Sequence, residues 1–262
     1  MNKEVNITKK NNPAVDVIIT NFNKASFIEE AILSVIKQTY KNWKLYIIDD
    51  NSSDKSLEII NKFCDIKNIT VVKLSKNKGP SFARNYGMRI SNSKYISFLD
   101  SDDSWTVNKL EKQIFFMEKN SFSFTYTDYK PFFENNGKKR FKKRTFLKNF
   151  FDYDAFIKNS SINTTTMIIA RSILGSHRFK KVKLLEDYLF KCELLKNNFK
   201  ATKLGEDLAF YRFLNRSRSS RRLKNVYWLW LINRNYNKLN FIKNLISIFC
   251  ISLNSIKKYG IK

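Results

Sequence analysis

Three apolar runs that end at polar or acidic residues constrain the fold of this chain most strongly. They are Val15–Thr20, Leu45–Ile48 and Ile96–Leu99. Each has the composition of a buried strand, and each stops abruptly at side chains that suit a turn or a binding site. Helical segments separate the runs, so strands and helices alternate along the chain. This order predicts an α/β fold with a mainly parallel, Rossmann-like central sheet and flanking helices.

Helical periodicity locates the segments between the strands. Helices are predicted over residues 28–36, 54–64, 80–91 and 106–119, and a further short strand over residues 71–74. Ser26 and Glu29 have the spacing of a capping box at the start of the first helix. Pro80 suits the first turn of the third helix, because its missing N–H would lack an intrahelical partner there.

An acidic cluster follows the third apolar run. Asp100, Asp102 and Asp103 place three carboxylates within four residues. Carboxylates this close repel one another, and a bound cation removes the repulsion. Because carboxylate oxygens are the ligands that Mg²⁺ or Mn²⁺ prefers, the cluster predicts a divalent metal site. Taken alone, it is equally typical of a plain turn or a helix cap.

The polar ends of the three strands are expected at one edge of the sheet. In parallel α/β sheets, ligands bind outside the carboxyl ends of the strands. Thr20, Asp50 and the cluster Asp100–Asp103 all fall at such ends. The sequence therefore predicts one shared polar site.

Four segments in this order resemble the family 2 glycosyltransferases. They are Val15–Asn23, Ile47–Asp54, Gly79–Gly87 and Phe98–Asp103, and the resemblance covers roughly residues 13–215. It implies the A-type nucleotide-diphospho-sugar transferase fold. It also implies transfer of a sugar from a nucleotide diphosphate to an acceptor hydroxyl, with inversion at the anomeric carbon. UDP is the donor nucleotide that the family suggests.

The resemblance implies which residues meet the nucleoside. It places Thr20, Asn21 and Asp50 at the base and the ribose, with Arg84 lining the same cleft. For Arg84, a solvated position on a helix surface is the alternative.

The resemblance also assigns the acidic cluster. Asp102 and Asp103 match the pair that meets the ribose and the diphosphate-bound metal, which is Mn²⁺ or Mg²⁺. Asp100 opens the motif and is expected to support the donor and the metal indirectly. Which carboxylate contacts the ion directly is left open.

A general base for the acceptor hydroxyl is predicted just after Leu185. The reaction needs a group that takes the hydroxyl proton, while the metal neutralises charge on the departing diphosphate. Glu186 and Asp187 stand in the first turn of a helix with a buried face, where acids also simply complement the helix dipole. The family pattern has an acid pair here whose Asp is the base, which favours Asp187.

Two departures from the family pattern bear on the reaction. Many relatives have Tyr-Arg-x-His after the base-bearing helix, whereas this chain has Tyr211–Leu214, so any contact made by that histidine is lost or replaced. The Gln-x-x-Arg-Trp signature of processive synthases is absent. The chain is therefore expected to add one sugar per encounter.

Other site chemistries have little support in the sequence. Cys64, Cys192 and Cys250 lack Cys-x-x-Cys spacing, which indicates neither a zinc site nor a disulfide framework and fits a reducing, cytoplasmic compartment. The single histidine, His177, lies in a basic, surface-like stretch. Residues 1–12 have no long apolar core, so we expect a flexible tail there and no secretory signal.

The formal net charge of +26 predicts an acidic partner, although a lysine-rich proteome would explain part of it. Basic residues cluster at 138–144, where a loop is predicted, and at 212–224. The second cluster precedes Trp228 and Trp230, and aromatic residues beside cations suit a membrane interface. Residues 216–262 are therefore predicted to form a helical appendage on the inner membrane face, with packing on the enzyme core as the alternative.

The leading interpretation is a glycosyltransferase domain, residues 13–215, that acts on a glycan or lipid-linked acceptor at the cytoplasmic membrane surface. A non-enzymatic nucleic-acid-binding protein is the first alternative. The predicted cleft acids would repel a phosphate backbone, so no nucleic-acid partner is expected. An inactive transferase-like scaffold is the second alternative, and the complete set of acids argues against it.

Overall fold

The computed structural model describes residues 12–135, 138–142, 148–214 and 222–259. Its strands are β1 (Val15–Asn21), β2 (Trp43–Asp49), β3 (Ile69–Lys73), β4 (Tyr95–Asp100), β5 (Ser104–Trp105), β6 (Phe124–Asn135), β7 (Lys138–Phe141), β8 (Phe150–Phe151), β9 (Ile168–Ala170) and β10 (Ala201–Arg212). Its α-helices are α1 (Ile28–Ile36), α2 (Ser56–Asn61), α3 (Pro80–Ile90), α4 (Lys109–Asn120), α5 (Tyr153–Phe156), α6 (Glu186–Lys196), α7 (Arg222–Asn235) and α8 (Phe241–Tyr259). Short 3-10 turns are η1 (Thr164–Thr166) and η2 (Arg171–Ile173).

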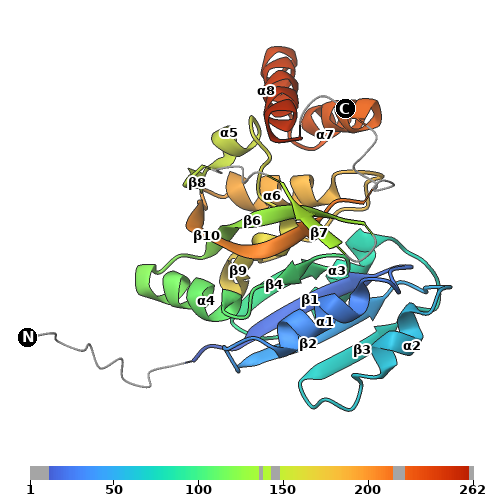
Figure 1. Ribbon diagram of the computed structural model, residues 1–262. Helices are drawn as coiled ribbons and strands as arrows, with labels where there is room; N and C mark the ends of the chain where they lie inside the picture. The colour runs from blue at the N-terminus through green and yellow to red at the C-terminus, as the bar shows by residue number, and fades with distance from the viewer. Residues whose placement is uncertain (1–11, 136–137, 143–147, 215–221, 260–262) are drawn as a thin grey trace, which may run out of the picture.

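One sheet with the strand order β3-β2-β1-β4-β9-β6-β10-β5 organises the molecule (Figure 1). Strands β3, β2, β1 and β4 are parallel neighbours. Strand β9 runs antiparallel between β4 and β6, and β6 pairs parallel with β10. The predicted α/β fold with a mainly parallel sheet is confirmed.

The apolar runs of the sequence form the centre of the sheet because both of its faces are covered. Residues of β1, β2 and β4, such as Val17, Ile47 and Phe98, are buried. Strands covered on both faces read as continuous apolar runs, which is why they were visible in the sequence. Helix α3 packs closely on β1, and a Cβ at Gly87 would lie 2.6 Å from Cγ2 of Ile18.

Two local predictions were wrong. The N-cap of α1 is Phe27 and makes no side-chain cap hydrogen bond, so Ser26 and Glu29 form no capping box there. Lys138–Phe141 forms the exposed strand β7, paired antiparallel with β6, where a loop was predicted. The sequence between the two strands contains Asn136-Gly137, a dipeptide that is typical of hairpins.

Helices α7 and α8 lie together at one end of the molecule, beyond α5 and α6 (Figure 1). Helix α7 packs on the core through the buried Leu229 and Ile232. Residues 1–11 and 215–221 lie outside the described residues, so most of the predicted tail and the predicted boundary at residue 216 lie there too. Among the helices that the structure describes, none combines the length and apolar character needed to cross a membrane.

Candidate active site

The ends of β1 and β2 form the predicted nucleoside side of the site. Thr20 is half-buried and pairs in register with Asp100 of β4. Asn21 is buried, and its Nδ2 donates to Oδ2 of Asp49 (2.8 Å) and to Oγ of Ser52 (3.1 Å). Asn21 therefore holds the turn after β2 in place, and Thr20 stands beside the acidic cluster.

Asp50 shapes the loop that leads into α3. Its carboxylate accepts hydrogen bonds from the backbone N–H groups of Lys78 (2.8 Å) and Gly79 (2.7 Å). Gly79 has a φ of 85°, in the left-handed region that favours glycine, directly before Pro80 begins the helix. The contact of Asp50 with a nucleotide remains a prediction.

Asp103 is the buried member of the acidic cluster. Its Oδ2 accepts from Oγ1 of Thr165 (2.7 Å), and its Oδ1 accepts from the backbone N–H of Arg212 (2.9 Å). Burial, followed by the charges of Asp102 and Asp100, raises the pKa of Asp103 well above its usual range, although the two hydrogen bonds act in the opposite direction. Asp103 thus ties the turn after β4 to the end of β10.

Asp102 and Asp100 are the more exposed members of the cluster. Lys24 places its Nζ 2.7 Å from Oδ2 of Asp102, whose side chain is 23% exposed. Arg84 places one guanidinium nitrogen 2.9 Å from Oδ1 of Asp100. Each of these carboxylates therefore has a cationic partner and still reaches the surface.

The donor set fits a divalent ion that shares its coordination with a substrate. In the described part of the chain, no group of three or more His, Cys, Asp and Glu side chains is arranged to hold a metal by itself. Mg²⁺ is commonly held by one or two carboxylates together with phosphate oxygens and water. Asp102 and Asp100 can supply such a pair, and the mutual repulsion in the cluster favours a cation there.

Arg84 joins the two halves of the site. It is buried on α3, and its second guanidinium nitrogen lies 3.5 Å from Oε1 of Glu186, while its guanidinium faces the ring of Phe179 at 5.2 Å. Burial would lower the pKa of Arg84, but Asp100, Glu186 and Asp187 raise it. The alternative of a solvated surface cation is wrong, and one side chain links the end of β4 to the start of α6.

Asp187 lies in the first turn of α6 with 36% of its side chain exposed. Its Oδ2 is 2.8 Å from Nζ of Lys191 and accepts from Oγ1 of Thr164 at 3.3 Å. Burial alone would raise the pKa of Asp187, but Lys191 and, less strongly, Arg84 lower it to about 2. Asp187 is therefore ionised at neutral pH, as a proton acceptor must be.

The residue before this acid pair has an unusual backbone. Leu185, the N-cap of α6, has a φ of 63°, which is uncommon for a bulky side chain. Such conformations persist where the surrounding structure enforces them, often at functional sites. The chain thus turns sharply where it delivers Glu186 and Asp187.

Sequence reasoning missed the side chains that support the acids. Thr164 and Thr165 of η1 contact Asp187 and Asp103, so this turn connects the two ends of the site. Lys191 is buried and also donates to the carbonyl of Ile162 (2.7 Å). The spacing of four residues between Asp187 and Lys191 on a helix was the available signal.

Arg212 does not belong to an exposed basic cluster. Its side chain is buried at the end of β10, forms ion pairs with Glu30 (2.6 Å) and Glu134, and donates from Nε to the carbonyl of Asp102 (3.0 Å). It stabilises the turn of the acidic cluster. Lys143, Arg144, Arg216, Arg218 and Arg221 of the predicted basic clusters lie outside the described residues.

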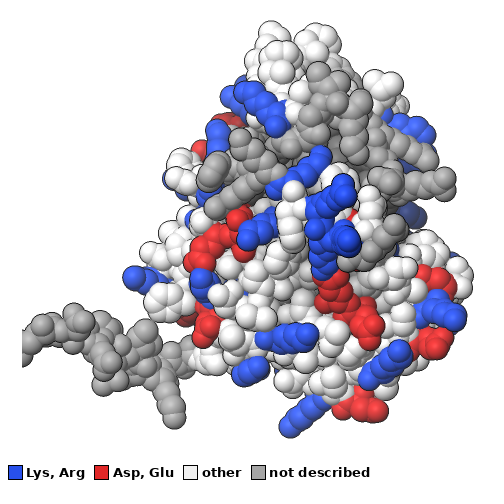
Figure 2. All heavy atoms as spheres, in the orientation of Figure 1, with Lys and Arg blue, Asp and Glu red and all other residues white. Residues whose placement is uncertain are grey.

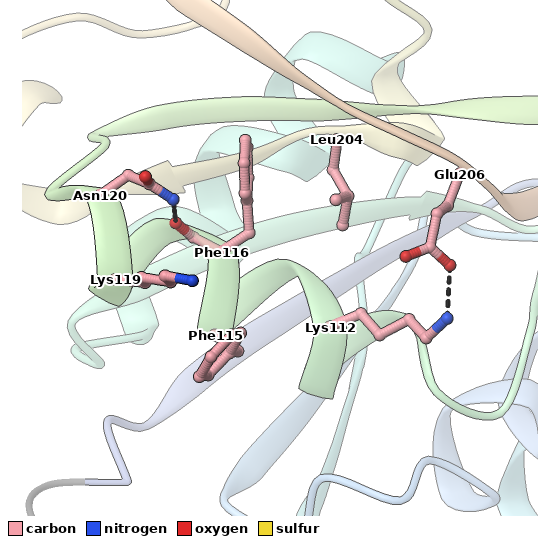
Figure 3. A pocket seen from close by; sticks show the side chains of 7 residues that line it. All are labelled: Lys112, Phe115, Phe116, Lys119, Asn120, Leu204 and Glu206. Atoms are coloured by element: carbon pink, nitrogen blue, oxygen red, sulfur yellow. Dashed lines mark hydrogen bonds and ion pairs between the residues drawn. The ribbon is translucent and has the colours of Figure 1, made fainter. Parts of the chain in front are cut away.

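A separate groove of about 430 Å³ lies between α4 and β10 (Figure 3). It is lined by Lys112, Phe115, Phe116, Lys119, Asn120, Leu204 and Glu206. Lys112 and Glu206 form an ion pair at one end of it. None of the predicted site residues lines this groove, so it is distinct from the carboxylate site.

The family follows from a comparison with known proteins. The model of glycosyl transferase family 2 matches residues 16–179, which are more than half of the chain. The chain belongs to this family. The glycosyltransferase interpretation is thereby confirmed, and the nucleic-acid-binding alternative is not favoured.

Named relatives and a solved structure agree with this assignment. The chain is 32% identical to the putative teichuronic acid biosynthesis glycosyltransferase TuaG of Bacillus subtilis, over 94% of this chain and 97% of that protein. It is 34% identical to the Escherichia coli UDP-Glc:alpha-D-GlcNAc-diphosphoundecaprenol beta-1,3-glucosyltransferase WfgD, over 82% of this chain and 83% of that protein.

The chain also shares its fold with a mannosyltransferase of known structure. The mannosyltransferase PcManGT of Pyrobaculum calidifontis, determined with GDP-Man and Mn²⁺, superposes with a TM-score of 0.69 over 96% of this chain and 72% of that one. At 12% identity this likeness shows the fold alone. It confirms the predicted A-type glycosyltransferase fold.

Proposed function

We propose that this family 2 glycosyltransferase moves one sugar per encounter from a UDP-sugar to a hydroxyl of a lipid-linked glycan, with inversion, at the cytoplasmic membrane surface. The names of its relatives support this substrate class, because one uses UDP-Glc and a diphosphoundecaprenol-linked acceptor.

The state of Asp187 carries the proposal. The acid is ionised, is partly open to solvent and is fixed through Oδ2 by Lys191 and Thr164. In the proposed reaction the acceptor hydroxyl gives its proton to Oδ1 of Asp187. Its oxygen bonds to the anomeric carbon while the bond from that carbon to the diphosphate oxygen breaks. Because attack and departure occur on opposite faces, the anomeric configuration inverts.

Asp102, with Asp100, is the proposed holder of a Mn²⁺ or Mg²⁺ ion. When bound, the ion would neutralise charge on the departing diphosphate. Asp103 is proposed to support the turn that carries Asp102 without contacting the ion. Its two carboxylate oxygens already accept hydrogen bonds from Thr165 and from the backbone N–H of Arg212. Lys24 is close enough to the cluster to meet a phosphate once Asp102 engages the metal.

A donor screen tests this function directly. Thermal denaturation is followed with UDP-, GDP- and TDP-sugars, with Mn²⁺ and with a chelator, because a ligand that binds only the folded state raises the melting temperature. We expect stabilisation by a UDP-sugar that requires Mn²⁺. The stabilising donor is then incubated with a short-chain analogue of GlcNAc-diphosphoundecaprenol. Failure of every nucleotide sugar to stabilise the protein would refute the proposal.

A further inference from the structure

Helix α8 attaches to the protein through uncharged polar residues and turns a row of apolar residues outward. Asn244 and Ser247 are fully buried. Nδ2 of Asn244 donates to the carbonyl of Trp230 (3.2 Å), and Oγ of Ser247 donates to the carbonyl of Ile157. Farther along, Nδ2 of Asn254 donates to the carbonyl of Lys158 (3.2 Å). These three uncharged residues interrupt the apolar sequence of the helix and attach it to the protein, together with Ile248 and Ile251, which pack against the core.

The opposite side of α8 is a continuous apolar surface, here named the outer stripe. Its residues are 40–68% exposed. They are Ile242, Leu245, Ile246, Phe249, Leu253 and Ile256. At 3.6 residues per turn they fall within about 100° of the helix circumference. A surface helix normally turns such a stripe toward the core, so its exposure indicates an apolar partner.

The tryptophan pair, which was predicted to suit a membrane interface, is not the most exposed apolar part of the appendage. Trp228 and Trp230 are only partly exposed, and the ring of Trp230 packs edge-on against Phe241 with 5.5 Å between centroids. Most of the exposed large apolar side chains in the described part of the appendage lie on α8 instead. In Figure 2 the end of the molecule that carries α8 shows white surface and undescribed grey atoms, with blue Lys and Arg side chains beside them.

Charge indicates the nature of that partner. After Asp207 the sequence has no Asp or Glu and twelve Lys and Arg residues. Lys243 and Lys257 are exposed, and both lie along one edge of the outer stripe on the helical wheel. A second copy of this chain would bring the same positive charge to the interface, whereas an anionic phospholipid surface complements it.

We infer that the outer stripe of α8 docks on the surface of a bilayer that contains anionic phospholipid. The apolar side chains enter the boundary between headgroups and acyl chains, and Lys243 and Lys257 meet the phosphates. The use of such docking to the enzyme rests on the proposed lipid-linked acceptor. The apolar and basic side chains that would bind the bilayer do not depend on that proposal.

Hydrogen bonds connect this surface to the candidate base. Oη of Tyr188, the residue after Asp187, donates to Oδ1 of Asn233 on α7 (2.9 Å). Nδ2 of Asn233 donates to Oγ of Ser247 on α8 (2.9 Å). Helix α6, which carries the base, is thus fixed to the docking helix, so an acceptor anchored in the same bilayer would be held near Asp187.

Vesicle co-sedimentation of the full chain tests the inference. The vesicles are phosphatidylcholine alone and phosphatidylcholine mixed with phosphatidylglycerol. Wild type should bind the mixed vesicles, and the double variant Ile246→Gln/Phe249→Gln should bind at least about tenfold more weakly, because two apolar side chains no longer enter the lipid. The matched control is Phe115→Gln on α4, which is 51% exposed in the wild type and should leave binding unchanged.

A second variant tests the electrostatic part. Lys243→Gln/Lys257→Gln should weaken binding to mixed vesicles and reduce its dependence on salt. Equal binding of wild type to neutral and anionic vesicles, or equal losses in Phe115→Gln and in the α8 double variant, would overturn the inference. So would a wild-type dimer in sedimentation velocity that the α8 double variant dissociates, without any binding to vesicles.

The donor screen keeps this test separate from the proposed function. Ile246→Gln/Phe249→Gln should retain the Mn²⁺-dependent stabilisation by a UDP-sugar, since the changed side chains are exposed on α8. Vesicle binding without donor binding would remove the proposed function and leave the docking surface. Donor binding without vesicle binding would remove the docking surface and leave the proposed function.

Discussion

Asp187→Asn is the change that most directly tests the base. In the folded protein the pKa of Asp187 is about 2, against 3.8 for an ordinary aspartate. At about 1.4 kcal/mol per unit, this difference corresponds to about 2 kcal/mol of stability. Because 36% of the side chain is exposed, solvent screening reduces the contribution to about 1 kcal/mol. The variant should therefore fold, with a free energy of unfolding lowered by about that amount.

The same change should remove most of the activity. General-base catalysis contributes about 10²- to 10⁴-fold, and an amide cannot take the acceptor proton. We expect kcat to fall by that factor while the affinity for the UDP-sugar stays near that of wild type. Initial rates with saturating donor and acceptor give kcat, and the thermal shift with donor and Mn²⁺ reports binding.

Lys191→Met is the matched control, because it breaks the same ion pair from the other side. It should cost about 1–3 kcal/mol of stability, since the Ile162 carbonyl also loses its buried donor. The carboxylate of Asp187 remains, so kcat should fall far less than in Asp187→Asn. Equal losses of kcat in the two variants, measured well below both melting temperatures, would show that the pair is structural and that the base lies elsewhere.

Three further outcomes are expected. The stability difference between wild type and Asp187→Asn should be complete above about pH 4 and disappear as the pH falls through about 2, because the folded pKa lies below the unfolded one; urea titrations across this range measure it. Asp102→Asn should abolish Mn²⁺-dependent donor binding with little change in the melting temperature of the free protein. Asp103→Asn should instead lower the free energy of unfolding by about 1–3 kcal/mol, because one of two buried hydrogen bonds loses its acceptor. Thermal denaturation with and without donor distinguishes the two variants. Gly87→Ala should destabilise by about 1–3 kcal/mol, since its Cβ would lie 2.6 Å from Ile18, and unchanged unfolding would contradict this packing.

The sequence by itself determined the parallel part of the sheet and the residue types at its edge. Strands β1, β2 and β4 are buried on both faces, so their apolar runs were visible without a structure. Because parallel strands end at one edge, Thr20, Asp50 and Asp100 were expected together, and Thr20 does pair in register with Asp100. The acid pair in the first turn of α6 was visible because apolar residues at helical spacing follow it.

Only the tertiary structure decided how the charges are paired. Arg212 was assigned to a basic cluster, and a solvated surface position was the alternative for Arg84. Both are buried between carboxylates that are distant along the chain. Turn η1 reaches both Asp103 and Asp187 because β9 inserts antiparallel between β4 and β6, and no local pattern predicts such an insertion. The same holds for α8. The periodicity of its sequence reveals an apolar face but does not tell which face meets the protein. That depends on the backbone carbonyl groups of Trp230, Ile157 and Lys158. They accept hydrogen bonds from Asn244, Ser247 and Asn254, respectively.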